Sequence, residues 1–159
     1  MESSLIKLII FDLDGVLVDA RELHYNALNK ALGSIDEKYV ISREEHLSTY
    51  DGLSTTKKLN MLTQNKGLPT ELHDTVWKLK QKMTMGIING FSVDDRIKSI
   101  IRSFKSNGYM IACATNSIRE TAKLQLIRKG LFEYIDFMYS NQDVKNPKPN
   151  SEMYLRCMI

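Results

Sequence analysis

Two aspartates lie two residues apart at the end of an apolar run near the N-terminus. Asp12 and Asp14 flank Leu13 and are followed by Gly15, directly after the run Leu5–Phe11. Like charges at this spacing oppose joint ionisation, and a divalent cation relieves that cost. An aspartate beside a metal can attack phosphorus and form an aspartyl-phosphate, while a second carboxylate acts as general acid and base. The pair therefore predicts phosphoryl transfer, against the simpler interpretation of two solvated turn residues.

Two further polar clusters follow apolar runs later in the chain. Thr115 and Asn116 come after the run Tyr109–Ala114 and precede a helix start, where a hydroxyl and free N–H groups bind anions. Their alternative role is only to help that helix begin. Lys148 lies in the polar loop Ser140–Asn150, where an ammonium can neutralise phosphate oxygens and a nucleophilic carboxylate. A lone loop lysine is usually solvated, so the order of the three clusters carries the interpretation.

Short apolar runs alternate with amphipathic segments, which is the pattern of an α/β protein with an open parallel sheet. Ligands of such sheets bind at the carboxyl ends of the strands, so the three polar clusters are expected to meet there. The expected strands are Leu5–Phe11, Tyr109–Ala114 and Ile135–Tyr139. Helices are expected from Asp94, from a Ser117–Glu120 capping box to Gly130, and from near Ser151. In the first of these helices, the residues expected to face inward are Ile97, Ile100, Ile101 and Phe104.

A block without strand signals separates the first strand from the rest of the chain. Four amphipathic helices with short connections fit this block and predict a small bundle. We divide the chain into an α/β core of residues 1–16 and 87–159, with a Rossmann-like sheet, and a helical insertion of residues 17–86. The four helices are expected at Arg21–Leu32 before Gly33, after the Ser42–Glu45 capping box, after a cap at Ser54 or Thr55 and up to Gly67, and across Leu72, Val76, Leu79 and Met83.

The composition of the 159 residues excludes several classes of protein. A net charge of +3 is too small to argue for nucleic acid. No apolar stretch approaches the roughly 20 residues that a bilayer needs, and the N-terminus lacks a signal-peptide pattern. Cys113 and Cys157 have no partners at zinc-ligand spacing and do not suggest a disulfide scaffold. We therefore expect no nucleic-acid or membrane partner and a cytoplasmic location.

In this order, the motifs resemble the haloacid dehalogenase superfamily, in the branch that includes β-phosphoglucomutase and small phosphatases. Asp12–Asp19 is similar almost letter for letter to the first family motif, Ala114–Ser117 to the second and Asp143–Tyr154 to the third. The resemblance implies a Rossmann-like core with an all-helical cap, Mg²⁺ as cofactor, and hydrolysis of a small phosphorylated metabolite through an aspartyl-phosphate. The alternatives are a catalytically impaired remnant that only binds phosphate and a sugar-phosphate mutase.

The resemblance also implies a role for each site residue. Asp12 corresponds to the nucleophile and Asp14 to the general acid and base, with the Asp12 carboxylate and the Asp14 carbonyl on Mg²⁺. Thr115 and Lys148 correspond to residues that contact the phosphoryl group, with Lys145 as the competing lysine. The other residues expected at phosphate or substrate are Leu13, Gly15 and Asn116, together with Gly52 in a cap loop, Tyr50–Ser54.

The fourth motif of the family, an acidic pair that completes the Mg²⁺ site, has no counterpart after Lys148. The adjacent pair Asp94–Asp95 lies upstream at a helix start and is no substitute. We therefore expect a weakly held metal, in a chain that is either naturally short or a fragment. The strand with the fourth motif lies beside the first strand in the family, so Leu5–Phe11 is expected to have an open edge that invites self-association.

Overall fold

The computed structural model describes residues 7–51 and 53–159. The chain divides into two compact units, one made of Met1–Arg21 with Ile88–Ile159 and the other of Glu22–Ile87. Each unit has a hydrophobic core of its own. Leu17 and Val18, which were expected in the helical insertion, belong to the first unit and are buried with Leu13 in its core.

The first unit is built on a three-stranded sheet with the order β1-β2-β3. β1 (Leu8–Phe11) pairs in parallel with β2 (Met110–Ala114), and β3 (Phe137–Tyr139) pairs in parallel with the other side of β2. Within the described residues β1 pairs with β2 alone, so its other edge is open. Asp12 and Thr115 directly follow the first two strands at the same edge, which confirms the expected α/β sheet architecture.

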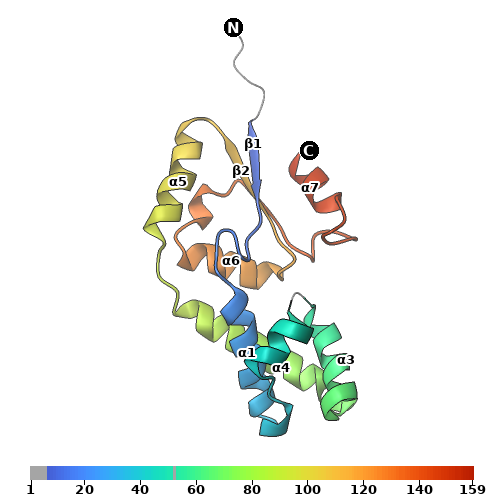
Figure 1. The fold of residues 1–159 in the computed structure, drawn as a ribbon. Coiled ribbons are helices and arrows are strands. Elements are labelled where there is room, and N and C mark those ends of the chain that lie inside the picture. Colours follow the sequence, from blue (N-terminus) through green and yellow to red (C-terminus); the bar gives the residue numbers. More distant parts are fainter. Residues whose placement is uncertain (1–6, 52) are drawn as a thin grey trace. The chain divides into compact units, whose positions relative to one another are not determined.

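Helices cover both faces of this sheet (Figure 1). α5 (Asp95–Ser106) and α6 (Arg119–Arg128) lie over one face, and α7 (Glu152–Cys157) lies over the other. Side chains alternate along β2, so Cys113 belongs to the core under α5 and α6 while its neighbour Ala114 packs against α7. The strand ends are therefore held by packing from both sides.

Leu126 on α6 provides a stability test of the first core. It is fully buried in the cluster that contains Leu13 and Ile101. Because Leu126→Ala removes buried methyl groups and leaves a cavity, we expect it to lower the free energy of unfolding by about 3 kcal/mol. Leu155→Ala, at a residue that is 55% exposed, is the matched control and should change it by less than about 0.5 kcal/mol. Urea unfolding followed by circular dichroism measures both, and equal effects would contradict this assignment of the core.

The second unit is a set of helices around Leu28, Leu62, Val76 and the residues packed with them. Its local signals are confirmed, since Ser42 forms a complete capping box and Ser54 accepts the Lys57 N–H at the start of the third helix. The α-helices are α1 (Arg21–Gly33), α2 (Arg43–Glu45), α3 (Thr55–Lys66) and α4 (His73–Asn89), with short helices of other types at Glu37–Tyr39, His46–Tyr50 and Thr70–Leu72.

Some expected details of the first unit are wrong. Ile100 is 47% exposed rather than inward, because the next residue, Ile101, occupies the buried side of α5. The third strand begins at Phe137 rather than Ile135, because a 3₁₀ turn at Phe132–Tyr134 precedes it. Ser117 does not cap α6, whose N-cap residue is Ile118 without a side-chain bond, and the helix ends at Arg128 rather than continuing to Gly130.

Leu5 and Ile6 of the expected first strand, and Gly52 of the expected cap loop, lie outside the described part of the chain. In the part that is described, no helix combines the length and apolar character needed to cross a bilayer.

Candidate active site

An ion pair joins the residue after β1 to the loop after β3. The Lys148 ammonium lies 2.8 Å from Asp12 Oδ1 and donates a hydrogen bond to the Ala114 carbonyl at 2.9 Å. The lysine side chain is only 13% exposed, whereas that of Asp12 is 43% exposed. The Leu13 N–H also donates to Asp12 Oδ1, at 2.7 Å. Asp12 Oδ2 accepts no hydrogen bond from the described residues, so it is the oxygen open to a ligand or an electrophile.

Thr115 is fully buried at the end of β2. Its N–H donates to the Tyr139 carbonyl at 2.9 Å, and its Oγ1 accepts the Ser117 N–H at 3.0 Å. These bonds fix the position of the hydroxyl oxygen. Its own proton meets no acceptor among residues 7–51 and 53–159, which leaves this donor for an anionic oxygen.

The side chain of Asn116 forms hydrogen bonds with the backbone of Lys148. Asn116 Oδ1 accepts the Lys148 N–H at 3.0 Å, and Nδ2 donates to the Lys148 carbonyl at 2.9 Å. Both polar atoms of the amide are used, so the Asn116 side chain holds the loop that carries the lysine. The expected place of Asn116 at phosphate stays a prediction.

Asp14 is contacted from the α6 segment. Ser117 Oγ donates to Asp14 Oδ2 at 2.6 Å, and Gln125 Nε2 lies 3.5 Å from Asp14 Oδ1. This explains why Ser117 does not cap α6, because its hydroxyl is committed to a carboxylate 103 residues away. Sequence reasoning missed both contacts, since neither residue is near Asp14 along the chain.

Backbone hydrogen bonds close the turn that follows Asp14. The Gly15 N–H donates to the Val18 carbonyl at 2.7 Å, and the expected place of Gly15 at phosphate stays a prediction. Gly15 has a φ of 83°, a left-handed value that strains residues with a Cβ. The Leu13 carbonyl accepts the N–H groups of Leu17 and Val18, both at 3.0 Å. Leu13 itself is buried, and its own N–H serves Asp12 as described above.

The loop that bears Lys148 is ordered by Asp143. This carboxylate accepts the Ser140 N–H at 2.7 Å and the Ser140 hydroxyl at 2.6 Å, and pairs with Arg119. Burial alone would raise the pKa of Asp143, but the hydrogen bonds from Arg119 and Ser140 outweigh it and hold the pKa below its usual value. The competing lysine, Lys145, is exposed, and its N–H binds Glu152 at 3.0 Å.

Cys113 lies in β2, and its thiol is influenced by the charges of Asp12 and Lys148. Burial raises the pKa of its thiol to about 12, with the negative charge of Asp12 acting in the same direction and Lys148 opposing it. The thiol is therefore neutral near pH 7 and is unsuited to act as a nucleophile.

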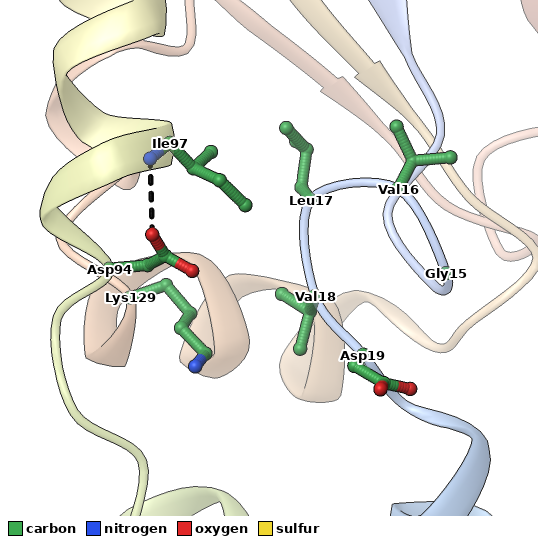
Figure 2. Close-up of a pocket in the computed structure, with 8 residues that line it drawn as sticks. All are labelled: Gly15, Val16, Leu17, Val18, Asp19, Asp94, Ile97 and Lys129. Atoms are coloured by element: carbon green, nitrogen blue, oxygen red, sulfur yellow. Dashed lines mark hydrogen bonds between the residues drawn. The ribbon is translucent and has the colours of Figure 1, made fainter.

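A cleft of about 580 Å³ lies beside the turn that follows Asp14 (Figure 2). Asp12, Thr115 and Lys148 do not line it, so it is separate from the polar residues at the strand ends. One of its walls contains the N-cap bond of α5, from the Ile97 N–H to the Asp94 carboxylate (Figure 2). Its lining residues are Gly15, Val16, Leu17, Val18, Asp19, Asp94, Ile97 and Lys129.

The oxygen donors at the strand ends fit a site for Mg²⁺. Among the described residues, no three His, Cys, Asp or Glu side chains gather into a metal cage. Mg²⁺ is commonly held by one or two carboxylates with waters and substrate phosphate, so a full cage is not required. The open Oδ2 of Asp12 matches that donor chemistry.

Comparisons with known proteins find phosphatases among the similar sequences. A curated phosphorylated carbohydrates phosphatase of Thermotoga maritima is 26% identical over 156 residues, which cover 92% of this chain and 67% of that protein. The pyrophosphatase PpaX of Bacillus velezensis is 25% identical over 154 residues, 91% of this chain and 63% of the relative. The chain thus spans about two thirds of the length of these relatives.

Solved structures share the fold. A β-phosphoglucomutase of Clostridium difficile is 26% identical with a TM-score of 0.75, over 95% of this chain and 69% of that one. A predicted phosphoglycolate phosphatase of Haemophilus somnus, at 20% identity, superimposes with a TM-score of 0.81 over 96% of this chain and 71% of that one. The family model for haloacid dehalogenase-like hydrolases matches residues 9–159, and the chain belongs to this family.

Proposed function

We propose that this chain is a Mg²⁺-dependent phosphohydrolase that acts on a small phosphorylated metabolite through an aspartyl-phosphate. The observation that carries the proposal is the position of the Lys148 ammonium, 2.8 Å from Asp12 Oδ1 and 2.9 Å from the Ala114 carbonyl. It brings a half-buried cation to a partly exposed carboxylate at the ends of two parallel strands. A carboxylate with one oxygen neutralised and one oxygen open is suited to attack phosphorus.

In the first step Asp12 Oδ2 attacks phosphorus, and the bond from phosphorus to the leaving oxygen breaks. Asp14 gives a proton to that oxygen, so an alcohol leaves and the phosphoryl group stays on Asp12. In the second step Asp14 takes a proton from water as the water oxygen attacks phosphorus, which releases phosphate and restores the Asp12 carboxylate. Bound Mg²⁺, held by the Asp12 carboxylate and the Asp14 carbonyl, would neutralise charge on the phosphoryl oxygens.

The phosphoryl oxygens need donors that are already in place, because the transition state spreads charge over them. The Lys148 ammonium supplies one, and the Thr115 hydroxyl, fixed by the Ser117 N–H at 3.0 Å, supplies another. The Lys148 ammonium also donates a hydrogen bond to the Ala114 carbonyl, which holds it in place. These contacts are made within one unit of the fold.

We further propose that the helices of Glu22–Ile87 act as the cap that selects the substrate. The relative named for phosphorylated carbohydrates supports a sugar phosphate or a similar small ester as substrate. The likeness to a β-phosphoglucomutase at 26% identity supports the mutase as second candidate, in which a substrate hydroxyl replaces water in the second step.

The proposal is tested by phosphate release from p-nitrophenyl phosphate. Turnover is expected with Mg²⁺ and should disappear with EDTA. Asp12→Asn should abolish it, whereas Asp95→Asn, at an exposed position on α5, should leave it unchanged. Folded protein without turnover above the Asp12→Asn variant would contradict the enzyme and favour phosphate binding without chemistry.

Asn116→Ala tests the support of the lysine loop. Removing the amide frees the Lys148 backbone from both of its hydrogen bonds, so the ammonium is held less accurately. We expect kcat to fall about 10-fold, because small misplacements of a positioned charge are costly. Asn107→Ala, which removes an exposed amide bonded to the Ser103 carbonyl, is the control. Steady-state kinetics that show equal rates for the two variants would contradict this role of Asn116.

Two further expectations stay proposals. The open edge of β1 supports self-association, which sedimentation velocity of the chain at increasing concentration can measure. The free thiols of Cys113 and Cys157 support a reducing cytoplasm.

A further inference from the structure

A buried glutamine on α6 lies against the second carboxylate of the site. Gln125 is 0% exposed, its Nε2 lies 3.5 Å from Asp14 Oδ1, and its Oε1 has no hydrogen-bond partner in the described part of the chain. Glutamine is mostly found at the surface, and an amide oxygen buried without a partner costs free energy. A methionine would fill a similar space without that cost. The amide therefore does not serve to raise the free energy of unfolding.

Ser117 and Gln125 together present one donor to each oxygen of Asp14. The Ser117 hydroxyl, at 2.6 Å from Oδ2, comes from just before α6, and the Gln125 amide comes from the helix itself. A carboxylate contacted at both oxygens has fewer side-chain rotamers available. If the Gln125 amide were reversed, its oxygen would face the carboxylate and repel it, so the N–H side is the one turned to Asp14.

α6 is fixed in the core on the same turns that carry the glutamine. Ala122 and Leu126 are fully buried and pack with Leu13, which stands directly before Asp14 in the chain. The donor and the acceptor are therefore both tied to one packed cluster. A side chain on a helix fixed in this way can hold its partner in a constant direction.

We propose that Gln125 is a positioning residue for Asp14 and aims its carboxyl group at the leaving oxygen of the substrate. The proposal rests on the phosphoryl transfer described above. An uncharged amide suits this task, because a carboxylate at residue 125 would repel Asp14 and an aliphatic side chain would offer no donor.

The dependence of the rate on the leaving group distinguishes this positioning role from a purely structural role of Gln125. In aspartyl-phosphate formation the bond from phosphorus to the leaving oxygen breaks while the proton of Asp14 moves to that oxygen. An alkoxide is a poor leaving group and needs this proton, whereas 2,4-dinitrophenolate leaves without it. A badly aimed Asp14 therefore lowers kcat/KM, which reports the first step, for alkyl phosphates and spares it for dinitrophenyl phosphate. The second step, in which Asp14 takes a proton from water, is the same for both esters and does not enter kcat/KM. General damage to the site slows both.

The test compares Gln125→Met with Thr121→Val. Thr121 lies one turn earlier on α6, is 3% exposed and has a buried Oγ1 without a partner, so Thr121→Val also replaces an unpaired buried polar group by an apolar one. For Gln125→Met we expect kcat/KM for glycerol 2-phosphate to fall about 10- to 100-fold, with less than about threefold loss for 2,4-dinitrophenyl phosphate. Thr121→Val should leave both values unchanged. Equal losses for the two esters, or no loss for either, would overturn the positioning role.

A second readout does not depend on turnover. The Hα–Hβ scalar couplings of Asp14 report its χ1 rotamer in the free protein. They should indicate one rotamer in the wild type and in Thr121→Val, and averaging between rotamers in Gln125→Met. Unchanged couplings in Gln125→Met would contradict the proposal. If the wild type hydrolyses neither ester, the phosphohydrolase assignment fails, and the couplings still decide whether Gln125 positions Asp14.

Discussion

Asp12→Asn is expected to lower Mg²⁺-dependent phosphate release by at least about 10³-fold. An amide oxygen is a much weaker nucleophile than a carboxylate oxygen, and no acyl-phosphate can form on it. The substitution also removes the negative charge that lies 2.8 Å from the Lys148 ammonium. The loss is therefore one of chemistry at a single oxygen and does not require any change of fold.

Two measurements separate this loss from unfolding. Thermal unfolding of Asp12→Asn should stay within a few degrees of the wild type, because Lys148 keeps its 2.9 Å hydrogen bond to the Ala114 carbonyl. Acid-quenched wild-type protein should carry one phosphoryl group on the peptide that contains Asp12, and this adduct should be cleaved by hydroxylamine. An adduct on another residue, or turnover by the variant within about tenfold of the wild type, would exclude Asp12 as the nucleophile.

The fold was predictable where local chemistry decides it. Ser42, Ser54 and Asp94 each cap a helix as expected, because the bond runs from the side chain to a backbone N–H only three residues away. The parallel strands were predictable for a similar reason. Short β-branched and apolar runs that end in polar turns indicate strands buried on both faces, and β1 and β2 have this character.

Prediction failed where a residue is used by a distant partner. Ser117 has the spacing of a capping box, yet its hydroxyl donates to Asp14, 103 residues earlier, and α6 begins without a side-chain cap. Gln125 looks like one polar residue of an amphipathic helix, and only the fold shows that it is buried beside Asp14. Spacing along the chain carries no information on such pairs.

The choice between two lysines is a further case of this kind. Lys145 and Lys148 lie in one polar loop, and neither hydrophobic pattern nor spacing separates them decisively. The structure distinguishes them by a contact across 32 residues, because the Asn116 amide binds both the N–H and the carbonyl of Lys148. Lys145 is exposed, and its backbone N–H donates to Glu152.

Lys148→Met is accordingly expected to lower kcat by about 10²- to 10³-fold, and Lys145→Met by less than about twofold. Methionine matches the length of the lysine stem but brings no charge, so Asp12 loses its counter-ion and the transferring phosphoryl group loses a donor that is already in place. On the proposed mechanism the same donor would also contact the bound substrate, so KM should rise for Lys148→Met. Steady-state kinetics on p-nitrophenyl phosphate measure both variants.

The pair of variants also tests how the loop works. The Lys148 side chain is 13% exposed and its ammonium contacts a carboxylate and a carbonyl, so its removal changes the field at the reacting carboxylate, where screening by water is reduced. A charge at Lys145 is screened by solvent, and its loss should be felt weakly even though it lies only three residues away. If Lys145→Met were the damaging change, the loop would have to be rearranged when substrate binds, and the contacts that Asn116 makes with Lys148 would have to break during turnover.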